Sequence, residues 1–237
     1  MIEEWLIKEP EGKAKHCILS LPGRANGTSL MVNIGEDMRL PNTLVASVRT
    51  RTYSWYPMPV SATDQQEAVM GLPAARGALW GVLKRIERAW GISSKNIAII
   101  GFSAGAVMSV EVAVHGQEPY AGVVCFAGTV LEPDKVPPKN EKNDTPIMLV
   151  HYEQDACFDW DERYVPMREA LISKGYRVQR RENSDGGHTI SRDDVMAGAH
   201  FLAKQFGYSD WVHPEYYRFW FQGNDDADDE GGGGGDE

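Results

Sequence analysis

Short apolar runs that are rich in β-branched residues alternate along this chain with longer segments of helical spacing. The runs predicted to be strands are residues 16–21, 43–48, 96–102, 121–126, 147–151 and 176–181. The segments predicted to be helices are residues 64–90, 104–115, 161–174 and 191–206. Pro73 predicts that the first part of 64–90 is kinked or separate. The alternation is typical of βαβ units, so we expect a three-layer α/β fold with a mostly parallel central sheet flanked by helices.

The chain has 237 residues, of which 42% are hydrophobic, and this is enough to bury one sizeable core. We predict a single domain over residues 1–207, an aromatic-rich segment at 208–223 and an acidic Gly/Asp tail at 224–237. The tail has nothing apolar to bury, so we expect it to be disordered. We expect the aromatic segment to pack on the domain, and a lid, a dimer contact or an acyl-binding surface are the alternatives.

The net charge of −10 is concentrated at the C-terminus, because seven acidic residues lie in the last fourteen positions. The rest of the chain has one short dense basic cluster, at residues 177–181, so we do not expect nucleic acid as a partner. The N-terminus does not resemble a secretory signal, and no apolar run is long enough for a membrane span. These features predict a cytoplasmic protein without a membrane span. Cys17, Cys125 and Cys157 lack CxxC spacing, which disfavours a disulfide framework or a structural zinc site.

The segment Gly101-Phe102-Ser103-Ala104-Gly105 has the pattern GxSxG between a predicted strand and a predicted helix. This pattern in this setting places a serine nucleophile on a sharp, strained turn. Glycines on both sides prevent clashes with the neighbouring elements, and the N–H groups at the start of the helix can stabilise an oxyanion. We therefore predict Ser103 as a nucleophile and the Ala104 N–H as one oxyanion donor; the alternative is a glycine-rich turn without catalytic function.

The partners of such a serine follow in the order acid, then histidine, on loops that leave the carboxyl ends of later strands. Asp155 follows strand 147–151, and His188 lies in a glycine-rich loop after strand 176–181. We predict that His188 takes the proton of Ser103 as general base and that Asp155 orients the histidine. Three other acids compete for the role of Asp155: Glu153, Asp159 and Asp161. A second oxyanion donor is expected from the loop after strand 16–21, and the N–H of Arg24 is our choice.

These motifs, in this order, resemble the phospholipase/carboxylesterase family of α/β hydrolases, which includes acyl-protein thioesterases and small carboxylesterases. The resemblance runs from about Cys17 to about Phe206. In that family the early strand ends in a Leu-His-Gly-like motif, the serine turn reads like Gly-Phe-Ser-Gln-Gly, the acid loop like His-Gly-x-x-Asp and the base loop like Gly-Gly-His. The segment Ser54-Trp55-Tyr56 also resembles a Ser-Trp-Phe/Tyr segment of the family.

The resemblance implies an α/β-hydrolase fold and hydrolysis of a carboxylic ester through an acyl-enzyme, without a metal or an organic cofactor. A thioester or a lysophospholipid is the alternative substrate on the same machinery, and a homodimer is a possible assembly. This chain departs from the family pattern with Pro22 for His, Ala104 for Gln, Tyr152 for Gly, and Cys157 to Trp160 where Val-Pro is common. The substrate-pocket candidates are aromatic residues that either narrow an acyl pocket or pack as ordinary core: Trp55, Tyr152, Phe158 and Trp160.

Three other function classes compete with a carboxylesterase. A peptidase or lactonase would use the same serine chemistry. A metallohydrolase would use His151, Asp155, Asp159 and Asp161, but it leaves Ser103 and His188 without roles. A non-catalytic binding module would be expected to have lost part of the triad, and each predicted member is in place.

Overall fold

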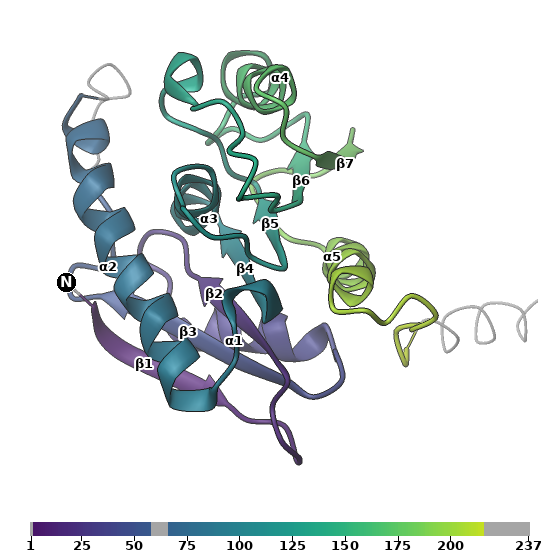
Figure 1. The fold of residues 1–237 in the computed structure, drawn as a ribbon. Coiled ribbons are helices and arrows are strands. Elements are labelled where there is room, and N and C mark those ends of the chain that lie inside the picture. The colour runs from purple at the N-terminus through teal and green to yellow at the C-terminus, as the bar shows by residue number, and fades with distance from the viewer. Residues whose placement is uncertain (1, 58–65, 216–237) are drawn as a thin grey trace, which may run out of the picture.

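The computed structural model describes residues 2–57 and 66–215, and its centre is a seven-stranded sheet (Figure 1). The strands lie side by side in the order β1-β3-β2-β4-β5-β6-β7. Only the edge strand β1 is antiparallel to its neighbour, and the other pairs are parallel. The strand bounds are β1 (Ile2–Lys8), β2 (His16–Leu21), β3 (Thr43–Thr50), β4 (Ile97–Phe102), β5 (Gly122–Phe126), β6 (Ile147–Tyr152) and β7 (Val178–Asn183).

Helices cover both faces of the sheet and complete three layers (Figure 1). The helix bounds are α1 (Thr28–Asp37), α2 (Gln66–Trp90), α3 (Ala104–Val114), α4 (Val165–Ser173) and α5 (Arg192–Gln205). Alternate residues of the buried strands point to opposite faces, as the two-residue period of a strand requires. In β4, for example, Ile97 and Ile99 pack toward α2, α3 and α4, whereas Ala98 and Ile100 pack toward α1 and α5. The expected three-layer α/β architecture with a mostly parallel central sheet is confirmed.

The predicted helix over 64–90 is one continuous α2 from Gln66 to Trp90, so of the two outcomes predicted for Pro73, a kinked or a separate first part, the separate one is wrong. Pro73 is exposed, and therefore water can solvate the Val69 carbonyl that loses its helical hydrogen bond. The predicted helix over 161–174 begins as a π turn at Trp160–Tyr164 before α4 starts. Among the strands and α-helices of the described residues, strand β1 and helix α1 were not predicted.

The described part of the aromatic segment packs on the domain at α5 and at the turn before β3. Tyr208 and Trp211 join the apolar cluster of α1 and α5, and the Tyr208 hydroxyl donates to the Pro41 carbonyl at 3.4 Å. His213 Nε2 lies 2.7 Å from the Asp37 carbonyl at the end of α1. Residues 216–223 and the predicted acidic tail at 224–237 lie outside the described residues. Within the described ranges, no helix is long and apolar enough to cross a membrane.

Candidate active site

Ser103 lies at the turn between β4 and α3, in a backbone conformation that is rare for residues with a side chain. Its φ is 54° and its ψ is −121°, outside the main allowed regions. The turn is tight on both sides, because a Cβ on Gly101 would lie 2.3 Å from the Gly105 oxygen, and one on Gly105 would lie 2.0 Å from the Leu21 oxygen. Only glycine fits at these two positions, as the GxSxG pattern predicted.

The loop after β2 lies directly against the serine. A Cβ on Gly23 would come within 3.1 Å of the Ser103 Cβ. The loop is held by the segment after β3: the Trp55 indole donates to the Pro22 carbonyl at 2.8 Å, and Arg24 Nη2 donates to the Ser54 hydroxyl at 3.1 Å. The backbone of this loop and the start of α3 therefore border the same serine. The oxyanion roles of the Arg24 and Ala104 N–H groups stay a prediction.

Asp155 and His188 come together although they lie on loops after different strands. His188 Nδ1 is 2.8 Å from Asp155 Oδ2 and 3.1 Å from Oδ1. The carboxylate is buried, and its Oδ1 also accepts the N–H groups of Cys157 at 2.8 Å and Phe158 at 3.0 Å. Burial by itself would raise the pKa of Asp155, but these hydrogen bonds to the charged form outweigh it and hold the pKa below its ordinary value.

The competing acids have other positions. Asp159 caps the π turn, where its carboxylate accepts the N–H groups of Asp161 and Glu162, both at 2.9 Å. Glu153 and Asp161 are exposed. Of the four acids considered from the sequence, it is Asp155 that hydrogen-bonds His188. In the metallohydrolase set, His151 Nε2 lies 3.9 Å from Asp155 Oδ2, whereas Asp159 is occupied as a helix cap.

His188 is fixed by aromatic neighbours as well as by the carboxylate. Its ring centroid lies 5.0 Å from that of Phe102, the residue before Ser103, and 5.8 Å from that of Phe158 in an edge contact. Nδ1 faces Asp155, so Nε2 is the nitrogen left for a reacting group. Asp155, Cys157 and His188 also present potential metal-ligating atoms within 4.8 Å of one another, but a metal there would compete with the Asp155–His188 hydrogen bond.

His151 supports the acid loop, a role that sequence reasoning missed. It is almost fully buried, its ring stacks on Tyr164 with 4.6 Å between centroids, and its Nε2 lies 2.8 Å from the Phe158 carbonyl. Burial lowers the pKa of His151, which favours the neutral ring and an Nε2–H that donates to this carbonyl. The bond closes the loop whose N–H groups hold the Asp155 carboxylate. The signal was present in the sequence as a histidine at the end of an apolar strand.

The four pocket candidates occupy different places. Trp55 is buried beneath the Pro22 loop, and the Trp160 ring contacts Tyr164 at 4.6 Å between centroids. The buried Tyr152 donates from its hydroxyl to Asp194 Oδ2 at 2.6 Å, and Gly186 of the base loop packs on its ring. Phe158 contacts the ring of His188. The pocket roles of these residues stay predictions.

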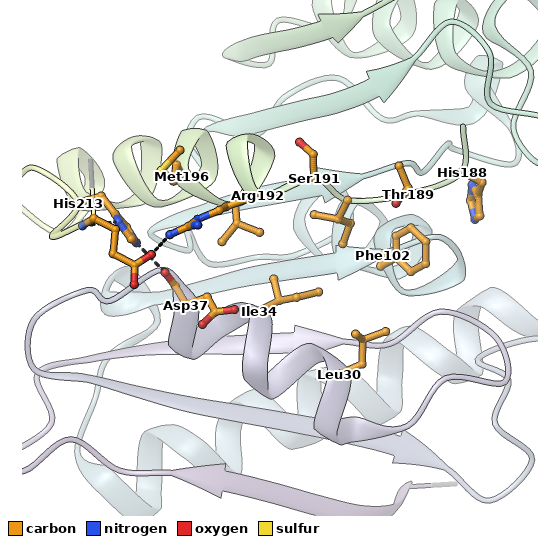
Figure 2. A pocket seen from close by; sticks show the side chains of 13 residues that line it. Leu30, Ile34, Asp37, Phe102, His188, Thr189, Ser191, Arg192, Met196 and His213 are labelled. Carbon is orange, nitrogen blue, oxygen red and sulfur yellow. Dashed lines mark hydrogen bonds and ion pairs between the residues drawn. The ribbon is translucent and has the colours of Figure 1, made fainter. Parts of the chain in front are cut away.

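A cavity of about 700 Å³ extends from His188 between α1 and α5 (Figure 2). Its described lining includes none of the four pocket candidates. Sequence reasoning missed its α1 wall because it did not predict that helix. Leu30 and Ile34 are spaced by four, which is a helical signal, and both line the cavity.

Comparison with known proteins places the chain in a family. The model of the phospholipase/carboxylesterase family matches residues 40–206. The chain is 27% identical over 206 residues to esterase YpfH of Escherichia coli (strain K12), covering 82% of this chain and 84% of that protein. Among solved structures, esterase PE8 has a TM-score of 0.76 at 21% identity, covering 84% of this chain and 98% of PE8.

Acyl-protein thioesterase 2 of Zea mays has a similar fold, with a TM-score of 0.73 at 16% identity, covering 86% of this chain and 99% of that one. At such identities the structural matches establish the fold alone. The family match spans more than half of the sequence and includes the serine turn, the acid loop and the base loop. The chain therefore belongs to the phospholipase/carboxylesterase family of α/β hydrolases.

Proposed function

We propose that this protein hydrolyses carboxylic esters through an acyl-enzyme, with Ser103 as nucleophile, His188 as general base and Asp155 as the acid that orients it. The observation that carries the proposal is the 2.8 Å hydrogen bond between the buried Asp155 and His188 Nδ1. Because this bond engages Nδ1, Nε2 of His188 is left to accept a proton, which is the task of the base in a serine hydrolase. The strained turn at Ser103 and the family match support the same assignment.

In the first half of the reaction, the Ser103 hydroxyl oxygen attacks the ester carbonyl while its proton passes to His188 Nε2. The carbonyl oxygen becomes an oxyanion, and we assign its stabilisation to the backbone N–H groups of Arg24 and Ala104. The tetrahedral intermediate then breaks its bond to the alcohol oxygen, which takes the proton from His188. Water attacks the acyl-enzyme with the same proton transfers in the second half, and the acid leaves.

The electrostatics around Asp155 suit a reaction in which His188 becomes positively charged when it accepts the serine proton. Its lowered pKa keeps the carboxylate ionised at neutral pH, so it stabilises the imidazolium that forms on His188. The two N–H donors from Cys157 and Phe158 fix the carboxylate in one orientation. We propose esters before thioesters as substrates because one relative, esterase YpfH of Escherichia coli, is an esterase.

The test is labelling and turnover in the wild type and in Ser103→Ala. We expect a fluorophosphonate probe to label the wild type, and we expect hydrolysis of short p-nitrophenyl esters that is unaffected by chelator. Both signals should disappear in Ser103→Ala. Labelling that persists in this variant, or activity that survives it but stops on addition of chelator, would refute the serine mechanism and favour the metal-dependent alternative.

A further inference from the structure

The cavity between α1 and α5 has an apolar part that starts at the candidate base. His188 and Phe102 lie at one end, and the walls come from α1 on one side and from the base loop and α5 on the other (Figure 2). The apolar lining consists of Phe102, Leu30, Ile34, Ile190, Val195 and Met196. A cavity of about 700 Å³ with such walls has the size and character of a small-molecule site.

The far end of the cavity is ionic, and its charges are largely paired within the protein. Glu215 forms ion pairs with Arg192 and, at 3.3 Å, with Arg39. The Asp37 side chain adds a negative charge beside them (Figure 2). A ligand therefore meets no unbalanced positive charge there that would attract an anionic group. The lining favours an uncharged, apolar occupant.

The position of His188 indicates which part of a substrate would lie in the cavity. In ester hydrolysis the base first accepts the serine proton and then delivers it to the oxygen of the departing alcohol, so this oxygen must lie beside His188. The acyl carbon is bonded to Ser103 instead, and Ser103 is not among the described residues that line the cavity. A chain attached to the alcohol oxygen enters the cavity at the His188 end.

We propose that the α1/α5 cavity is the leaving-group site and that it selects esters of uncharged alcohols with an apolar chain. This inference rests on the proposed function and adds the substrate class. Each methylene that the alcohol places against the apolar walls should raise kcat/KM about two- to fourfold. The gain should stop where the chain reaches the Arg192–Glu215 pair, because covering paired charges costs hydration without a new partner.

The experiment compares two ester series by the release of acid: acetates of straight-chain alcohols from methyl to octyl, and methyl esters of the matching straight-chain acids. In the wild type we expect kcat/KM to rise along the alcohol series and then level off. Where hydrolysis of the shared acetyl-enzyme limits turnover, kcat should be the same for all acetates, because the alcohol has already left.

Two variants narrow the cavity from opposite walls: Ile34→Trp on α1 and Met196→Trp on α5. Asn33→Trp is the matched control, because Asn33 is exposed on α1 and is not among the cavity-lining residues. Each cavity variant should lower the ratio of kcat/KM for hexyl acetate to that for methyl acetate about tenfold or more. The control should leave this ratio within about twofold of the wild type, and the ratios in the acid series should not change in any variant.

Each other result decides against the inference. If the cavity variants change the kcat/KM ratios within the acid series and leave those within the alcohol series unchanged, the cavity holds the acyl group. If neither ratio changes in either well-folded variant, the cavity is not a substrate site. If the wild type hydrolyses no ester and Ser103 is not labelled by a fluorophosphonate, the proposed function itself fails. Labelling of Ser103 thus separates failure of the substrate class from failure of the mechanism.

Discussion

Replacing Asp155 by asparagine is the sharpest test of the candidate triad, because the structure dictates how the new amide must be oriented. Oδ1 of Asp155 accepts two backbone N–H groups and lies 3.1 Å from His188 Nδ1, whereas Oδ2 is the nearer oxygen to Nδ1, at 2.8 Å. In Asp155→Asn the amide oxygen has to take the Oδ1 place, since an NH₂ group cannot accept a hydrogen bond. The NH₂ then points at His188 and donates to Nδ1. This arrangement moves the histidine proton to Nε2.

A histidine with its proton on Nε2 cannot take the proton of Ser103. We therefore expect kcat to fall about 10⁴-fold, as in a serine protease whose triad acid is replaced by its amide. This corresponds to about 5 kcal/mol of transition-state stabilisation. The assay is kcat with a short p-nitrophenyl ester, together with nitrogen NMR of the His188 ring, which reports the tautomer directly.

Asp159→Asn is the matched control for this prediction. Asp159 is exposed, and it serves as a cap through a single oxygen that accepts two N–H groups. Asparagine is an equally good cap, so kcat should stay within about twofold of the wild type. The reasoning would be refuted if kcat fell less than about tenfold in Asp155→Asn, or if the proton of His188 stayed on Nδ1 in this variant. A loss of kcat of more than about twofold in Asp159→Asn would refute it as well.

Three further predictions concern the turn, acid stability and metal dependence. Gly105→Ala should lower the free energy of unfolding by about 3 kcal/mol or more, because its Cβ would overlap the Leu21 oxygen. Gly77→Ala, in an open part of α2, should raise it by about 0.5–1 kcal/mol; urea unfolding measures both. The pKa of Asp194 is lowered in the folded protein, since its hydrogen bonds outweigh the raising effect of burial. Its stabilisation is therefore present above the unfolded pKa of about 3.9 and is lost as pH falls through the folded pKa. Asp194→Asn should move the midpoint of acid unfolding to higher pH, and an unchanged midpoint would contradict this. Excess EDTA should leave ester hydrolysis unchanged, and loss of activity that added zinc restores would contradict a metal-free mechanism.

The buried strands could be predicted from the sequence because their side chains are apolar on both faces. The run His16–Leu21 has the predicted bounds, and the serine turn follows β4 as the motif requires. The edge strand β1 escaped prediction because it is only partly buried and carries Glu3, Glu4 and Lys8 among its apolar residues. Its pairing with β3 depends on a partner that a local pattern does not contain.

Helix α1 escaped prediction for a related reason. Gly35 lowers its helix propensity, and Gly27 at its N-cap offers no side-chain cap. The glycine is needed for packing, because a Cβ at position 35 would lie 2.5 Å from Val45 of the sheet. Because α1 is not evident from the sequence, the wall formed by Leu30 and Ile34 could not be predicted, and the pocket candidates were instead aromatic residues after β3 and around the acid loop. Local patterns were enough to propose the candidate triad, whereas the cavity depends on tertiary packing.

The outer rim of the sheet at β7 has a consequence for self-association. An edge strand exposes unpaired backbone groups that can recruit an extended segment of another molecule. In β7 this rim carries Arg180, Arg181 and Glu182, and Glu182 is engaged by Arg168 at 3.0 Å and Arg180 at 3.6 Å. An incoming strand would have to strip water from these charges and break their pairing. The paired charges of β7 therefore disfavour the addition of a strand from another molecule to this edge of the sheet.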